Sequence, residues 1–142
     1  MTRRDVAFRA ATTTDRAGIR RLLRELHPDG ADAVTLPHVR QEAQTFVATD
    51  AGDVVGVAVA TFVDYGHSPY GTLEELVVDS SSRGAGIGMQ LLDQCRTWLD
   101  TLGVEVVFVS AINDEAADFY LSAGFTHCTG PWLFWTPQTT NE

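Results

Sequence analysis

The stretch Leu76-Val77-Val78-Asp79-Ser80-Ser81-Ser82-Arg83-Gly84-Ala85-Gly86-Ile87-Gly88 joins an apolar segment to a helical pattern through closely spaced glycines. Residues 72–78 are predicted to form a strand. A helix is predicted from the glycines to about Leu102, because apolar residues recur at helical spacing, namely Ile87, Leu91, Cys95, Trp98 and Leu102. Val104 to Val109 is nearly all apolar, as in a strand buried on both faces. The order predicts a parallel strand–helix–strand unit with a right-handed crossover.

The glycine turn before this helix suits a phosphate ligand. Gly84, Gly86 and Gly88 would let the backbone approach a ligand closely, and the first helical N–H groups lack acceptors within the helix. These donors and the helix dipole favour a pyrophosphate, and Arg83 adds a positive charge. Taken alone, the turn is also compatible with a tight connection that binds nothing.

Two other phosphate-binding motifs do not fit this turn. The P-loop motif is excluded because its Lys and Ser/Thr are missing. A dinucleotide-binding fold needs GxGxxG, but the third glycine would fall at Met89. Glu105 stands at the distance of the ribose-binding acid, yet it begins the next strand instead of ending it.

The rest of the chain adds strands and helices to this unit. A strand is predicted at 6–9, and a hairpin at 45–49 and 54–63. Terminal strands are predicted at 125–128 and 133–135. The first helix is capped by Thr13 or Thr14 and has an apolar side of Ile19, Leu22, Leu23 and Leu26; the last helix spans 113–122. The prediction is one α/β (α+β) domain over 1–142, with a mixed, mostly antiparallel sheet of six to seven strands and helices on both faces.

Length and charge narrow the functional classes. The chain has 142 residues, enough for one domain of normal size, and a net charge of -9. All ten basic residues are Arg. Residues 1–40 carry a balance of +3, whereas residues 41–142 carry -12. The acidic balance argues against a nucleic-acid partner and is compatible with a small cationic substrate, although solubility alone would also explain it.

Cysteine, histidine and hydropathy patterns add further expectations. Cys95 and Cys128 are too few and too far apart for a disulfide framework, and both are expected to be small buried residues. The four histidines show no metal-binding spacing, so no metal is expected. No apolar run approaches 18 residues and the N-terminus has no signal-like core, so we expect no membrane contact and a cytoplasmic location.

Two segments together resemble the GNAT superfamily of N-acetyltransferases. The 76–88 stretch resembles its acetyl-CoA motif, a hydrophobic strand followed by R/Q-x-x-G-x-G/A. The stretch Asn113-Asp114-Glu115-Ala116-Ala117-Asp118-Phe119-Tyr120-Leu121-Ser122-Ala123-Gly124-Phe125 is similar to the family segment N-x-x-A-x-x-F-Y-x-x-x-G-F at every marked position. The two motifs cover about residues 72–128. The resemblance implies the GNAT fold and direct transfer of acetyl from acetyl-CoA to a primary amine in a ternary complex.

The resemblance also implies a set of acetyl-CoA contacts. The strand main chain would pair with the pantetheine arm, and an N–H near Leu76 or Val77 would stabilise the oxyanion. The alternative role of these apolar side chains is core packing, and that of Asn113 is a helix N-cap. The expected contact residues are Leu76, Val77, Val78, Arg83, Gly84, Ala85, Gly86, Ile87, Gly88, Met89, Asn113 and Tyr120.

Three candidates emerge for proton transfer. By the resemblance, Tyr120 would protonate the departing thiolate; a half-buried aromatic without that role is the alternative. Glu75, then Glu74, would deprotonate the amine, and alternation along a strand predicts that their side chains point to opposite faces. The alternative for each glutamate is that its carboxylate is solvated and has no catalytic role. His67, in the loop before this strand, is a third candidate base.

The acceptor itself has no motif. We expect its pocket to involve the first helix, the 29–44 connection and the 64–71 loop, with Tyr65, His67, Tyr70 and His27 as lining candidates. A small cationic amine is the first expectation. A peptide or protein amine and a catalytically silent acyl-CoA-binding domain are the alternatives. A route through a cysteine acyl-enzyme is disfavoured, because Cys128 lacks a spaced His/Asp arrangement. As to oligomeric state, a homodimer is compatible with the sequence.

Overall fold

The computed structural model describes residues 5–30 and 35–137. The chain divides into two compact units, Met1–Ser110 and Ala111–Glu142. Within the described residues, the first unit holds a sheet and two α-helices, and the second holds one α-helix. In chain order the described elements are η1 (Thr13–Asp15), α1 (Arg16–Leu26), β1 (Arg40–Asp50), β2 (Asp53–Asp64), β3 (Tyr70–Val78), η3 (Ser80–Ser82), α2 (Ile87–Thr101), β4 (Val106–Val109) and α3 (Asp114–Ser122).

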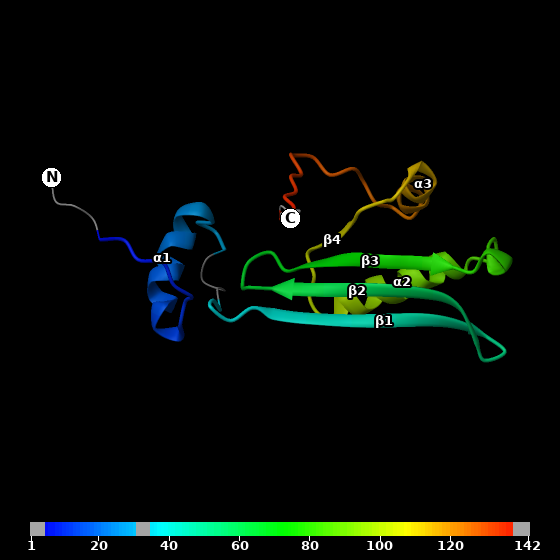
Figure 1. The fold of residues 1–142 in the computed structure, drawn as a ribbon, viewed down its shortest axis with the longest axis horizontal. Coiled ribbons are helices and arrows are strands. Elements are labelled where there is room, and N and C mark those ends of the chain that lie inside the picture. Colours follow the sequence, from blue (N-terminus) through cyan, green and yellow to red (C-terminus); the bar gives the residue numbers. More distant parts are fainter. Residues whose placement is uncertain (1–4, 31–34, 138–142) are drawn as a thin grey trace, which may run out of the picture. The chain divides into compact units, whose positions relative to one another are not determined.

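The described part of the chain forms a four-stranded mixed sheet in the order β1-β2-β3-β4 (Figure 1). β1 and β2 form the predicted antiparallel hairpin, and β3 continues the antiparallel pairing. β4 pairs in parallel with the beginning of β3, and α2 lies between these two strands in the chain. The mixed α/β architecture is therefore confirmed.

α2 builds the core by packing closely on one face of the sheet. Leu91, Leu92, Cys95 and Leu99 are its buried side chains. Two glycines on the sheet make room for them: a Cβ on Gly71 would lie 2.7 Å from Leu99 Cδ1, and one on Gly56 would lie 2.8 Å from Leu91 Cδ1. The predicted helix is confirmed, but its row of buried side chains differs from the predicted row, because Leu92 and Leu99 are buried in place of Trp98 and Leu102. Trp98 is half-buried and meets the edge of Phe46 instead of filling the core.

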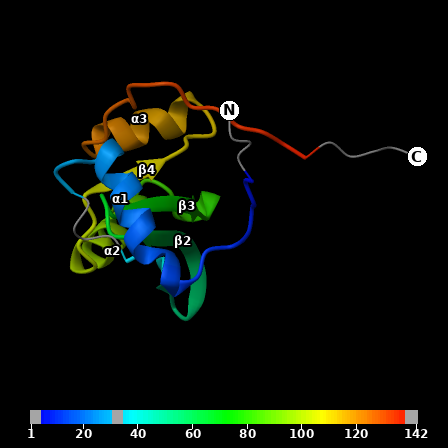
Figure 2. The same cartoon turned by 90° about the vertical axis from the view of Figure 1, so that its left-hand side faces the viewer.

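The prediction of six to seven strands is wrong for the described residues. The segments 6–9, 125–128 and 133–135 form no strand, and Phe8 is 93% exposed. Their composition favours a β conformation, but propensity alone does not supply a neighbouring strand with which to form hydrogen bonds. The strand predicted from Val104 is also shorter and begins at Val106. Helices on both faces are not seen in the first unit, because α1 lies beyond the sheet end where β2 finishes (Figures 1 and 2).

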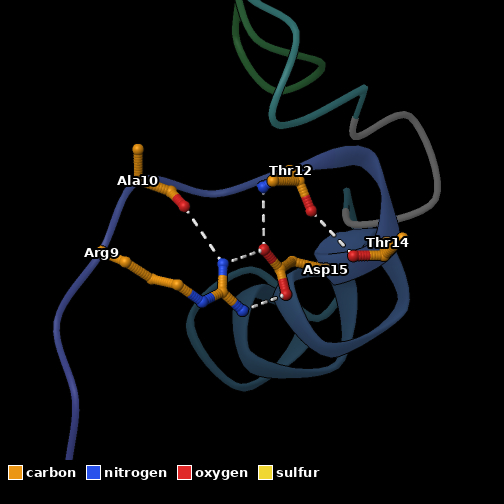
Figure 3. Close-up of polar contacts among 5 residues, drawn as sticks. All are labelled: Arg9, Ala10, Thr12, Thr14 and Asp15. Carbon is orange, nitrogen blue, oxygen red and sulfur yellow. Dashed lines mark hydrogen bonds and ion pairs between the residues drawn. The ribbon is translucent and has the colours of Figure 1, made fainter.

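α1 begins later than the sequence predicts. Thr13 and Thr14 belong to a 3-10 turn, and Asp15 is the residue that precedes α1. Both carboxylate oxygens of Asp15 accept 2.8 Å hydrogen bonds from the Arg9 guanidinium, and the Thr12 N–H donates a third (Figure 3). The hydrogen bond from Arg9 and the one from Thr12 lower the pKa of Asp15 far below its usual value. A capping box between Thr12 and Asp15, and not a cap by Thr13 or Thr14, therefore precedes α1.

Candidate functional site

The second half of β3 has an open edge within the first unit. The ladder with β4 ends at the pair Leu73–Val109, yet β3 continues to Val78. Residues 74–78 thus keep β2 on one side and, among the residues of the first unit that the structure describes, have no strand on the other. Backbone N–H and C=O groups along an unpaired edge can bind an extended ligand that carries amides. The predicted residues Leu76, Val77 and Val78 all lie in this half.

A β-bulge at the start of this open half changes the predicted orientation of the two glutamates. Val59 is opposite Glu75, whereas the next residue of β2, Ala60, is opposite Leu73. Glu74 is therefore the extra residue. Its Oε1 accepts a 2.8 Å hydrogen bond from Thr61 Oγ1.

Both carboxylates consequently lie on the sheet face away from α2. Val59 and Thr61 alternate along β2 with the fully buried Ala58 and Ala60, which face the core. The prediction of opposite faces is wrong, because it assumed regular alternation without the bulge. Glu75 and Glu74 are brought together, and both are exposed.

The glycine turn has the open geometry expected of a ligand cradle. Gly84 and Gly86 have φ of +86° and +77°, which side chains rarely adopt. A Cβ on either would meet no atom within 4 Å, so the turn presents bare backbone. Arg83 is tied to the end of β3, where its Nε donates a 3.3 Å hydrogen bond to the Val78 carbonyl. The open edge of β3 therefore leads directly into the turn.

The helix after the turn supplies N–H groups. Gly86 is the N-cap of α2, and its carbonyl accepts from the Gln90 N–H, the first bond of the helix. The N–H groups of the three residues between them have no helical acceptor. No acidic side chain occupies the first turn. The predicted residues Arg83, Gly84, Ala85, Gly86, Ile87, Gly88 and Met89 are thus contiguous around one helix N-terminus.

Asn113 and Tyr120 belong to the second unit, at the start and in the last turn of α3. Asn113 Oδ1 accepts a 2.8 Å hydrogen bond from the Ala116 N–H, so the N-cap role is confirmed. Tyr120 is half-buried and packs edge-to-face with Phe119 and Phe125. Both residues remain predictions as contacts of the cofactor.

A pocket of about 490 Å³ lies in the first unit at the opposite end of β3 from the glycine turn. Three acidic residues line it: Asp29 after α1, Asp64 at the end of β2 and Glu105 before β4. Asp64 Oδ1 accepts a 2.7 Å hydrogen bond from the Gly66 N–H. The full lining comprises Asp29, Gly30, Thr35, Asp64, Gly66, His67, Ser68, Pro69 and Glu105.

The pocket contains some of the predicted acceptor residues and others that the sequence did not reveal. His67 lines it, and His27 stacks on His67 with ring centroids 3.7 Å apart. Tyr70 instead meets the edge of Phe108. The acidic residues were missed because they come from three distant segments, and no local pattern signals their convergence.

The cysteines differ from each other. Cys95 is buried in α2, and burial raises the pKa of its thiol. Cys128 is exposed, so the prediction that it is buried is wrong.

Among the described residues, no group of three or more His, Cys, Asp or Glu could hold a metal ion. In the same part of the chain, no helix has the length and apolarity to cross a membrane.

Comparisons with known proteins agree with this geometry. The chain is 28% identical to a tRNA-acetylating toxin of Mycobacterium tuberculosis, over 62% of this chain and 64% of the toxin. An integron cassette protein from the mobile metagenome of V. cholerae has a TM-score of 0.58 and 27% identity, over 66% of this chain and 62% of that one. The chain therefore spans less than two thirds of either relative.

The fold is shared over a longer range with a more distant structure. An aminoglycoside N-acetyltransferase in complex with CoA has a TM-score of 0.58 and 20% identity, and the similarity covers 91% of this chain and 97% of that one. The family model described as an Acetyltransferase (GNAT) domain matches residues 41–127, which include β3, the glycine turn and α3. The chain belongs to the GNAT acetyltransferase family.

Proposed function

We propose that the protein transfers an acetyl group from acetyl-CoA to a primary amine by direct attack in a ternary complex. One observation carries this proposal: the unpaired half of β3 runs into a glycine turn at the N-terminus of α2. An extended ligand with amides at one end and a pyrophosphate at the other has the chemistry that this surface would bind.

The residues of the first unit fit acetyl-CoA. Main-chain groups of Leu76–Val78 would pair with the pantetheine amides. The amides of residues 87–89 and the Arg83 guanidinium would hold the pyrophosphate, and the bare backbone of Gly84 and Gly86 allows its close approach. When bound, acetyl-CoA supplies an acetyl group activated as a thioester.

Glu75 is the proposed general base. A primary amine arrives protonated, and its nitrogen must lose a proton before it can attack the carbonyl carbon. Glu75 and Glu74 lie together at the bulge, but Glu74 already accepts a hydrogen bond from Thr61. The Glu75 carboxylate would therefore take the proton, directly or through one water, while Glu74 positions the ammonium by its charge.

Tyr120 is the proposed general acid. As the new C–N bond forms, the C–S bond breaks and its electron pair goes to sulfur. The phenol O–H would donate a proton to that thiolate. The support is its place in the motif that matches the family. His67 is not favoured as the base, because it lines the pocket at the other end of β3.

The first acceptor class that we propose is a small cationic amine. Asp29, Asp64 and Glu105 give the pocket a negative wall. Pro69, which also lines it, is six residues before Glu75, or about 20 Å along an extended strand. The pocket would therefore hold a remote cationic part of an elongated acceptor, whose reacting amine lies near Glu75. The fold is shared with an aminoglycoside N-acetyltransferase, an enzyme named for such a substrate.

A second acceptor class has its own support. The M. tuberculosis relative is named for acetylating tRNA, and it is 28% identical to this chain over the matched 106 residues. An amine attached to tRNA is thus a second candidate. The proposal covers either class, because the base, the acid and the cofactor residues are the same.

The test is an acceptor panel read by thiol release, together with calorimetry of acetyl-CoA binding. The panel comprises polyamines, aminoglycosides, basic peptides and aminoacyl-tRNA. We expect acetyl-CoA to bind and at least one amine to accelerate CoA release. Binding without turnover on any acceptor would favour a silent acyl-CoA-binding domain. Absence of binding at millimolar acetyl-CoA would refute the proposal.

A further inference from the structure

α1 carries the densest positive charge of the described residues. Its 11 residues contain four arginines and one glutamate, a net charge of +3, whereas residues 41–142 carry -12. Arg16, Arg21 and Arg24 are exposed and Arg20 is half-buried. The argument from sequence against a nucleic-acid partner rested on the acidic balance of residues 41–142, and it did not consider that four of the eight arginines of residues 1–40 fall on this one helix.

The arginines lie on one side of the helix. Arg16, Arg20 and Arg24 are four residues apart, so they form one stripe about 12 Å long, and Arg21 widens it. The apolar residues Ile19, Leu22, Leu23 and Leu26 occupy the opposite side. The first unit thus presents a cationic ridge at α1, and the acidic pocket lies next to the end of that helix, where His27 stacks on His67.

We propose that the arginine side of α1 binds the phosphate backbone of an RNA, and that the acceptor amine is carried on that RNA. The second half of this statement rests on the proposed acetyl transfer; the first half does not. Arginine suits phosphate because its planar fork can donate two parallel hydrogen bonds. An RNA that carries a protonated amine matches this arrangement, since its phosphates would face the ridge and its amine would extend past the acidic pocket to Glu75.

The same ridge fits a membrane surface less well. α1 is about 16 Å long, and its apolar side has no aromatic residue to anchor in a lipid interface. The acidic balance of the remaining chain would also oppose adsorption over a wide anionic plane. An RNA backbone is narrow, so it can bind along the ridge without contacting most of that acidic surface.

The experiment measures binding of fluorescently labelled, deacylated bulk tRNA by anisotropy at about 50 to 200 mM salt. Three to four phosphate contacts predict a slope of log K against log salt of about -2 to -3. Arg21→Gln/Arg24→Gln should weaken binding at least about tenfold and make the slope shallower by about 1.4. The matched control, Arg40→Gln/Arg96→Gln, removes the same charge from β1 and α2 and should bind as the parent does.

A charge-conserving pair separates recognition from folding. Arg21→Lys/Arg24→Lys should restore most of the binding, and circular dichroism of every variant checks the helix. Absence of tRNA binding at the lowest salt, or equal losses in both glutamine pairs, would overturn the proposal. Tighter binding to vesicles containing phosphatidylserine than to tRNA would assign the ridge to membranes instead. Thiol release from acetyl-CoA on the same samples, with aminoacyl-tRNA and with small amines as acceptors, shows separately whether the proposed acetyl transfer has failed.

Discussion

The two halves of β3 differ in strand pairing and exposure although they belong to one strand. Residues 70–73 pair with both neighbours, and Gly71 and Leu73 are buried against the core. Residues 74–78 pair with β2 only, and Val77 is 52% exposed. The bulge at Glu74 separates the two halves. The paired half anchors the strand, so the unpaired half can leave its main chain accessible to a ligand.

The surroundings of the two halves differ in charge as well. The paired half begins beside the pocket with its three carboxylates, whereas the unpaired half ends at Arg83 and the N-terminus of α2. In the proposed function an anionic ligand and a cationic ligand would therefore be attracted to opposite ends of the same strand. In the proposed reaction this separation would keep acetyl-CoA and the acceptor from competing for one surface.

The largest effect is expected at the glycine turn. Gly86→Asp should reduce acetyl-CoA affinity at least about 100-fold, or about 2.7 kcal/mol, because it places a carboxylate against the phosphates and strains a positive φ. Calorimetry measures the loss. Gly103→Asp is the matched control, since that glycine at the other end of α2 has φ +85° and equal space. Equal losses in the two variants would remove the turn from the site.

The second-largest effect is expected when the hydroxyl of the proposed general acid, Tyr120, is removed. Tyr120→Phe keeps the ring between Phe119 and Phe125 and deletes only the hydroxyl. It should lower kcat about 100-fold with little change in acetyl-CoA affinity, because the phenol acts on the leaving thiolate and not on binding. Thiol-release kinetics and calorimetry on one sample measure both. Unchanged kcat would leave Tyr120 with a packing role alone.

The two carboxylates at the bulge should respond unequally. Glu75→Gln should lower kcat/KM by about 10- to 100-fold, and the loss should shrink as rising pH deprotonates the amine in solution. Glu74→Gln should cost about threefold, because its partner Thr61 can still hydrogen-bond the amide. A pH–rate profile of both variants distinguishes them. A larger loss in Glu74→Gln would reverse the assignment of the base.

The smallest effect is expected at the pocket. Asp64→Asn and Glu105→Gln should each raise KM for a cationic acceptor about fivefold and leave acetyl-CoA affinity unchanged, because they alter charge only at the paired end of β3. Steady-state kinetics with the best amine of the panel measure this. An unchanged KM in the double variant would show that the acceptor does not extend to the pocket.

The elements with strong local periodicity were predictable from the sequence. The helix from the glycines, the hairpin and the glycine turn follow from spacing that any one segment contains. The terminal strands failed because a strand needs a partner that local sequence does not specify. The first helix begins later than predicted because the local pattern did not reveal the 3-10 turn at Thr13–Asp15 and its capping box with Thr12.

The candidate site was predictable only in part for similar reasons. The residues from Leu76 to Met89 are consecutive, so one motif located them all. The shared face of Glu74 and Glu75 depends on a bulge that has no glycine or other local signature. The pocket carboxylates converge through tertiary structure, from positions 29, 64 and 105. Sequence reasoning therefore located the proposed cofactor surface and missed the acidic residues of the proposed acceptor pocket.

Hydrogen exchange with and without saturating acetyl-CoA addresses the role of the unpaired half of β3. The account predicts new protection in two places, the amides of Glu74–Val78 that face the open edge and those of Ile87–Met89. Exchange in Tyr70–Leu73 and in the β1–β2 hairpin should stay as it is in the free protein. Saturation with acetyl-CoA that leaves residues 74–78 and 87–89 unprotected would contradict the account.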